Sequence, residues 1–115
     1  MSQTPSLIAD FFQMKNEQND EELWKLFADD AVVVDTGEGK EMRGANEIKK
    51  WIAKSISGLN LQTEIRGSEE RDGEWIIDTV MTGNFKASPA RFQYFIKISF
   101  GKVSYLRAEF LGSLK

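Results

Sequence analysis

The hydrophobic pattern of this chain changes its period near Leu59, and this change constrains the fold more than any other feature. Before it, apolar residues recur at helical spacing, as in Leu7, Ile8, Phe11 and Phe12. After it, apolar and polar residues alternate as in a strand, starting with Leu61, Thr63 and Ile65. Helices followed by strands predict an α+β domain with the helices packed on one side of a sheet.

The first two helices are predicted from their capping residues. Thr4 and Pro5 suit the cap and first position of a helix, whose apolar stripe ends before a polar stretch, residues 15–19. Asn19–Asp20 is expected to start a second, shorter helix, and Asp29–Asp30 to end it.

A buried strand over residues 31–34 is expected next, because this segment is a continuous β-branched run. It stops on an acid, Asp35, and residues 36–41 have the composition of a polar loop. A third helix is predicted over residues 45–57, with Gly58 as its C-terminal stop.

Four antiparallel strands are expected in the second half. The first starts near Leu59, and the others cover residues 75–85, 91–100 and 103–111. They are joined by an Asp72–Gly73 hairpin turn, a loop containing Pro89, and a tight turn at Gly101–Lys102. The predicted architecture is one domain, residues 1–115, with three N-terminal helices packed on a curved antiparallel sheet that forms a cone. The apolar interior of such a cone is a natural ligand pocket.

Parity along the long strands assigns their two faces. One face is expected to carry Trp75, Ile77, Thr79, Met81, Leu106, Ala108 and Phe110. The opposite face would carry Ile76, Asp78, Val80, Thr82, Tyr105, Arg107, Glu109 and Leu111. Apolar residues on the outer face favour a homodimer through that face, although scattered surface apolar residues are the simpler alternative.

Composition excludes several kinds of chemistry. The chain has no cysteine and no histidine, which removes thiol nucleophiles, disulfides and the commonest metal ligand and general base. A net charge of −3 leaves no basic footprint for nucleic acid or a membrane surface. We expect a cytoplasmic protein, because no secretory signal or membrane-spanning run is visible. We expect no cofactor and no metal. Asp29 and Asp30 are more simply turn residues than a metal pair.

The segment Leu26–Val32, followed by Arg43–Gly44 and Glu47–Ile48, resembles the nuclear transport factor 2-like superfamily. Within it, the SnoaL-like polyketide cyclase and ketosteroid isomerase branch is the most similar, and Gly101–Val103 with Leu106–Phe110 fits the same branch. The resemblance covers nearly the whole chain. It implies the cone-shaped, cystatin-like fold and homodimers that pack back to back. It leaves function open, because one fold hosts many activities.

The isomerases of this branch use an acid at the end of the first strand as the base, and that position resembles Asp35. Their two oxyanion donors fall on Phe11 and Ile96 in an ungapped comparison, and supporting phenols fall near Phe27 and Ile52. None of these four side chains donates a hydrogen bond. The resemblance therefore implies a base without its usual oxyanion hole, which argues against steroid isomerase activity.

Asp35 is the predicted catalytic residue, as a general base in an apolar pocket. The expected lining is Phe11, Phe27, Trp51, Ile52, Ile77, Met81, Ile96, Ala108 and Phe110. Each has a simpler alternative: Asp35 could cap the following turn and face solvent, and the apolar residues could be ordinary core. Arg43 could bind an anion, or pair with Glu38, Glu41 or Asp35.

Three functions follow. The first is a SnoaL-like or isomerase-like enzyme that moves a proton next to a carbonyl group, using Asp35. The second is a non-catalytic module that binds an apolar small molecule. The third is a dimeric interaction module with a vestigial pocket.

Overall fold

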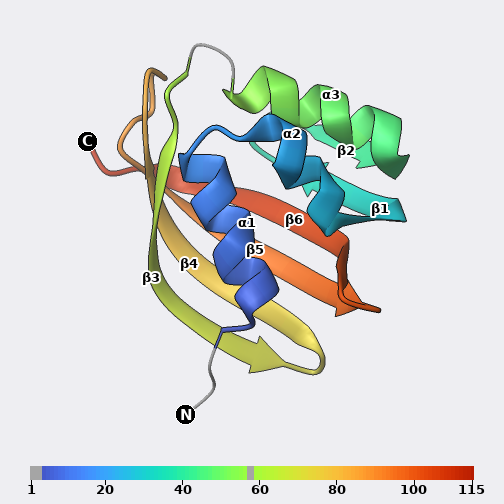
Figure 1. Ribbon diagram of the computed structural model, residues 1–115. Coiled ribbons are helices and arrows are strands. Elements are labelled where there is room, and N and C mark those ends of the chain that lie inside the picture. The colour runs from blue at the N-terminus through green and yellow to red at the C-terminus, as the bar shows by residue number, and fades with distance from the viewer. Residues whose placement is uncertain (1–3, 57–58) are drawn as a thin grey trace.

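A curved sheet with helices on its concave face makes up the part of the chain that the computed structural model describes, residues 4–56 and 59–115 (Figure 1). The strands are β1 Phe27–Asp35, β2 Lys40–Arg43, β3 Gln62–Arg71, β4 Glu74–Thr82, β5 Ala90–Ser99 and β6 Lys102–Ser113. The helices are α1 Ser6–Asn16, α2 Asp20–Leu23, the 3₁₀ turn η1 Trp24–Leu26, and α3 Gly44–Ile56. The strand order is β2-β1-β6-β5-β4-β3.

The α+β architecture is confirmed, but the sheet is mixed rather than purely antiparallel. Strands β3, β4, β5 and β6 pair antiparallel with one another in chain order, as predicted. Strand β1 pairs parallel with β6, with Asp35 opposite Ala108. The chain between β1 and β6 includes a helix, and a long connection of this kind allows two strands to run in the same direction.

Strand β2 occupies a segment whose first half was expected to be loop. It pairs antiparallel with β1, with Glu41 opposite Val34. Met42 is its one buried residue, and the other three are exposed. An edge strand so short and so polar carries almost no hydrophobic alternation, so its pattern resembles a loop.

Two predicted helix boundaries are wrong. Thr4 does not cap α1; its hydroxyl lies 2.7 Å from that of Ser68, and Pro5 takes the cap position. The second helix ends well before Asp29–Asp30, because β1 already begins at Phe27. The two acids lie exposed in β1, where its register with β6 shifts between Phe27 and Val32.

Helix α3 and the β3–β4 hairpin follow the prediction closely. The Glu47 carboxylate accepts a 2.8 Å hydrogen bond from the backbone N–H of Arg43 and so caps the start of α3. The predicted stop at Gly58 lies outside the described residues. At the β3–β4 turn, Asp72 and Gly73 have φ of 53° and 79°, as a type I′ hairpin requires.

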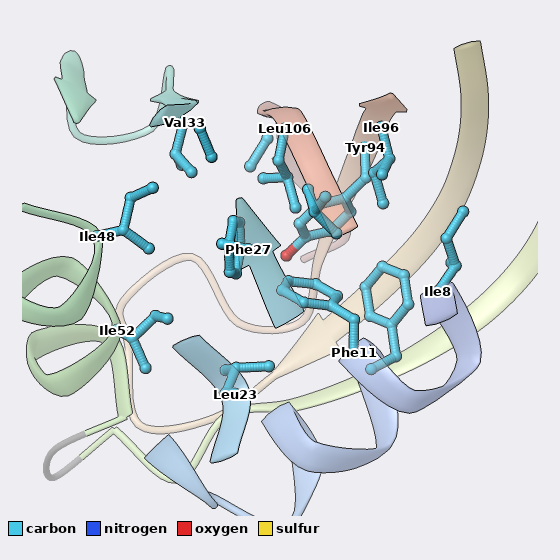
Figure 2. Packing of buried hydrophobic residues seen from close by; sticks show 14 of the residues in the cluster. Ile8, Phe11, Leu23, Phe27, Val33, Ile48, Ile52, Tyr94, Ile96 and Leu106 are labelled. Carbon is cyan, nitrogen blue, oxygen red and sulfur yellow. The ribbon is translucent and has the colours of Figure 1, made fainter. Parts of the chain in front are cut away.

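The core lies between the helices and the concave face. The predicted inner face of β4 is confirmed, since all four of its members are buried: Trp75, Ile77, Thr79 and Met81. Phe11 packs edge to face against Phe27 and Tyr94, with ring centroids 5.9 and 6.3 Å apart (Figure 2). On the outer face Ile76, Val80 and Tyr105 are half-buried.

Within the two described ranges, no helix is long and apolar enough to cross a membrane.

Candidate functional site

A cavity of about 360 Å³ opens between the helices and one end of the concave sheet. Residues of α1, α2 and α3 and of the strands β1, β4, β5 and β6 line it, and its surface is mostly apolar. The lining residues that carry a polar or ionisable side chain are Lys15, Asp35, Glu38, Trp51 and Tyr94. A cavity of this size suits a small molecule and places few polar groups against it.

Six of the nine predicted lining residues border this cavity: Phe11, Trp51, Ile52, Met81, Ala108 and Phe110. The other three, Phe27, Ile77 and Ile96, do not line it. They lie in the packed core, Ile77 and Ile96 fully buried and Phe27 nearly so. Strand parity identifies which face a residue occupies, but it does not say how far along the strand the helices leave space.

The Asp35 carboxylate faces the cavity and has a different partner for each oxygen. Its Oδ2 accepts a 2.9 Å hydrogen bond from the indole N–H of Trp51. Its Oδ1 accepts a 3.3 Å bond from the backbone N–H of Glu38, so the side chain also caps the turn after β1. The two interpretations of Asp35 are therefore not exclusive, because one oxygen holds the turn while the carboxylate borders the cavity.

Thr36 holds the strand end that carries Asp35. Its backbone N–H and its hydroxyl both donate to the Ala108 carbonyl, at 3.0 and 3.2 Å. The same hydroxyl accepts a 3.1 Å bond from the backbone N–H of Phe110. These bonds fix the end of β1 against β6, so that Asp35 is supported by the backbone of both strands.

Lys15 is a buried member of the site that the sequence reasoning placed in a polar stretch. Its Nζ donates a 2.9 Å hydrogen bond to the Thr63 hydroxyl, and 7% of the residue is exposed. Burial lowers the pKa of Lys15 from 10.5 to about 8, and the nearby Asp35 charge opposes part of that decrease. The signal was present, because Lys15 continues the apolar stripe of Ile8 and Phe11 at helical spacing.

Tyr94 supplies a phenol that the sequence comparison had not located. It lies on β5 two residues before Ile96, and therefore on the same face of the sheet. Figure 2 shows its hydroxyl directed toward Phe11 and Phe27, and no hydrogen-bond partner is present for it among the described residues. Burial raises the pKa of Tyr94, and the Asp35 charge adds to the rise, so the phenol remains protonated at neutral pH.

The other polar candidates lie away from the cavity. Arg43 forms an exposed ion pair with Glu41, with 2.6 Å between Nε and Oε2, rather than with Asp35. Asp29 and Asp30 face solvent on β1. In the described ranges, no three Asp or Glu side chains gather as a metal site would require. The cavity therefore combines the half-buried Asp35 carboxylate, the exposed Glu38 carboxylate, one buried amine and one buried phenol in an apolar setting.

Solved structures show which fold this is. A proposed polyketide cyclase from Sinorhizobium meliloti superposes with a TM-score of 0.86 at 24% identity, covering 92% of this chain and 95% of that one. A protein with a ketosteroid isomerase-like fold from Catenulispora acidiphila, in complex with trimethylamine, gives 0.83 at 21% identity, covering 97% and 88%. An NTF2-like protein of unknown function from Cytophaga hutchinsonii gives 0.75 at 13% identity, covering 95% and 92%.

The chain has the nuclear transport factor 2-like fold shared by these proteins. The resemblance found in the sequence, to SnoaL-like and ketosteroid isomerase-like proteins, is confirmed by the structural neighbours. No protein-family model and no curated protein matches the chain. Identities below 25% show the fold alone, so the activity has to be argued from the site.

Proposed function

We propose that this chain binds a small, mainly apolar carbonyl compound in the cavity and transfers a proton on it, with Asp35 as the base. One observation carries the proposal: an apolar cavity is bordered by a single strand-end carboxylate, held by the Trp51 indole N–H at 2.9 Å. The second oxygen is held by the backbone. A carboxylate fixed by two donors keeps one orientation while a substrate binds.

Tyr94 complements this base. Removing a proton from a carbon next to a carbonyl group puts negative charge on the carbonyl oxygen, and a donor near that oxygen stabilises the transition state. Tyr94 is buried and protonated and lines the cavity, and its hydroxyl makes no hydrogen bond among the described residues. We therefore assign it the role of oxygen donor, which Phe11 and Ile96 cannot fill.

The structural neighbours support the fold on which this proposal is built. A proposed polyketide cyclase and proteins with ketosteroid isomerase-like folds are among them. Their identities of 24% and 21% support the fold alone, so the proposed chemistry rests on Asp35 and Tyr94.

Hydrogen–deuterium exchange at the α-carbon of cyclic ketones tests the proposal. NMR in D₂O would follow exchange with the wild type, Asp35→Asn and Asp30→Asn, the last a matched control because Asp30 is an exposed acid on the same strand. We expect exchange with the wild type and the control, and its loss in Asp35→Asn. Equal exchange in all three proteins would overturn the role of Asp35.

A non-catalytic binding module is the alternative, favoured by the apolar side chains at the Phe11 and Ile96 positions. It predicts that ketones bind without exchange. Binding can be followed by tryptophan fluorescence, because Trp51 lines the cavity. Saturable binding with no exchange by the wild type would select this alternative.

We also propose that the outer sheet face packs against a second copy of the chain. Val32, Val34 and Phe95 are half-buried there, and Arg107 stacks on the Phe95 ring at 4.2 Å. Arg107 also lies near Glu109, with 3.8 Å between Nε and Oε1. A second copy packed on this face would cover these half-buried groups.

Light scattering tests the dimer. We expect a dimer for the wild type and a shift to monomer for Ile76→Glu, which puts a charge on the proposed interface. Asn46→Glu is the control, because Asn46 is exposed on α3, on the opposite side of the sheet from the proposed interface. A wild type that is monomeric at micromolar concentration would refute this assembly.

A further inference from the structure

Lys15 is the least explained polar group of the cavity. Its amine is buried, borders the cavity, and donates to the Thr63 hydroxyl at 2.9 Å. An ammonium group has three N–H donors, and within the described residues Thr63 is the partner that accepts from it. No carboxylate in that part of the chain forms a salt bridge with it. A buried ammonium without a paired anion is costly, so burial weakens the binding of the proton to this amine.

The fold holds this amine in place from both sides. The Asn16 side chain donates to the Thr63 carbonyl at 2.8 Å and accepts from the Thr63 N–H at 2.7 Å. Gln62 donates to the Asn16 carbonyl at 2.9 Å. The end of α1 is thereby clamped to the start of β3. The clamp sets the distance between Lys15 and Thr63, so the amine has a defined position at the wall of the cavity.

We propose that Lys15 is a nucleophile that forms a reversible imine with an aldehyde or ketone bound in the cavity. This inference rests on the proposed function and narrows it, because it assigns covalent activation of the carbonyl group to a named residue. In an imine, the substrate is bound covalently to Lys15 and is not merely polarised by hydrogen bonds.

The chemistry balances without any further reagent. The lone pair of the neutral Nζ attacks the carbonyl carbon, and the C=O electron pair moves to oxygen, which takes up a proton to give a carbinolamine. Nitrogen loses a proton, the hydroxyl group leaves as water, and a C=N bond forms. The net change is amine plus carbonyl compound to imine plus water. Protonated at nitrogen, the imine withdraws electrons from the adjacent C–H bond, whose proton Asp35 can accept.

The ionisation of the site fits this order of events. With its pKa near 8, Lys15 is partly neutral in mildly alkaline solution, where an ordinary lysine of pKa 10.5 is almost wholly protonated. Tyr94 remains protonated and can give a proton to the carbinolamine oxygen. Nucleophilic lysines are commonly activated in this way, by desolvation in an apolar pocket.

Reductive trapping tests the inference. The wild type would be incubated with benzaldehyde or cyclohexanone and sodium cyanoborohydride, followed by intact mass measurement and peptide mapping. We expect one lysine adduct, on Lys15, while the other nine lysines of the chain stay largely unmodified. Peptide mapping separates this adduct from any on the N-terminal amine, whose ordinary pKa is also about 8. The labelling rate should rise with pH through a midpoint near 8. Labelling spread over the exposed lysines, with Lys15 unmodified, would overturn the inference.

Two variants sharpen the test. Lys15→Arg keeps the positive charge but cannot form an imine, and should lose the single adduct. Lys50→Arg, on the exposed surface of α3, should keep it. Mapping the wild type decides the question even if Lys15→Arg folds poorly. Exchange dependent on Asp35 without trapping would leave the proposed function standing and refute the imine. Trapping at Lys15 with exchange unaffected by Asp35→Asn would support the imine and refute the role of Asp35 as the base.

Discussion

The indole N–H of Trp51 donates a 2.9 Å hydrogen bond to Oδ2 of Asp35, and this bond joins α3 to the end of β1 at the cavity. Both residues border the cavity, so the interaction is also part of the ligand-binding surface. It explains why an aromatic residue with a donor occupies this position of α3. A phenylalanine would line the cavity equally well but would leave the carboxylate oxygen without this partner.

Replacing Trp51 with phenylalanine should therefore lower both stability and activity. Loss of a hydrogen bond to a charged group is expected to reduce the free energy of unfolding by about 1 to 3 kcal/mol. Urea titration measures this change. Trp24→Phe is the matched control, because Trp24 is half-buried and donates no side-chain hydrogen bond among the described residues. An equal loss in both variants would point to indole packing rather than to the bond to Asp35.

Tyr94→Phe should separate function from stability. The hydroxyl has no hydrogen-bond partner among the described residues, so its removal should change the free energy of unfolding by less than about 1 kcal/mol. The exchange rate of a bound ketone should fall about 10²-fold, as when one oxyanion donor is lost. Thermal unfolding and NMR exchange measure the two effects. Unchanged exchange would remove Tyr94 from the proposed mechanism.

Lys15 should give the stability of the protein a pH dependence of a predictable sign. Its pKa is about 8 in the folded chain and returns to about 10.5 on unfolding. Between these values the unfolded chain binds the proton more tightly, so the stability rises with pH. Below pH 8 the full cost of the buried charge is present, and we expect Lys15→Met to be more stable than the wild type there.

The measurement compares urea unfolding of the wild type and Lys15→Met from about pH 7 to about pH 9.5. The advantage of Lys15→Met should shrink by about 2 kcal/mol over this interval. Stopping there avoids the ordinary titration range of tyrosine, in which the raised pKa of Tyr94 would act in the opposite direction. A difference that stays constant across the interval would contradict a depressed Lys15 pKa.

Gly83→Ala should damage the rim of the cavity. A Cβ at Gly83 would lie 2.7 Å from the Leu59 carbonyl oxygen and 2.8 Å from Cδ2 of Leu61, both cavity-lining residues. The backbone must shift to relieve this contact, and we expect a loss of about 1 to 3 kcal/mol with weaker ligand binding. Gly67→Ala is the control, because its Cβ would meet only Asp78 Oδ2, at 3.7 Å. Equal effects would show that the contact with Leu59 is unimportant.

The fold was predictable from the sequence because it depends on periodicity. Helical spacing placed α1 and α3, and alternation placed β3 to β6 and the inner face of β4. Strand β2 was not predicted, because an exposed edge strand needs little hydrophobic alternation. The parallel pairing of β1 with β6 depends on which strand edges remain free after folding, and no local pattern records it.

The site was predictable where it coincides with a strand end, and less so elsewhere. Asp35 was identified because an acid that follows a buried run is conspicuous. Lys15 was missed because it was assigned to a polar stretch, and Tyr94 because it was not assigned to a face of its strand, although both are buried. Ile96 was expected to line the cavity, but it lies in the packed core, because the cavity occupies only one end of the sheet. The space between packed layers depends on tertiary structure.

The pairing of β1 with β6 also decides when the site can exist during synthesis. Thr36, next to Asp35, is bonded to Ala108, which lies 72 positions later in the chain. A nascent chain that has emerged as far as β5 therefore contains every helix and five of the six described strands, but lacks the strand that pairs with both β1 and β5. Until β6 is added, Val33 has no strand partner on that side, and the strand end that carries Asp35 lacks its bonds to Ala108. The part of the cavity wall formed by Ala108 and Phe110 is thus the last part of the site to be synthesised.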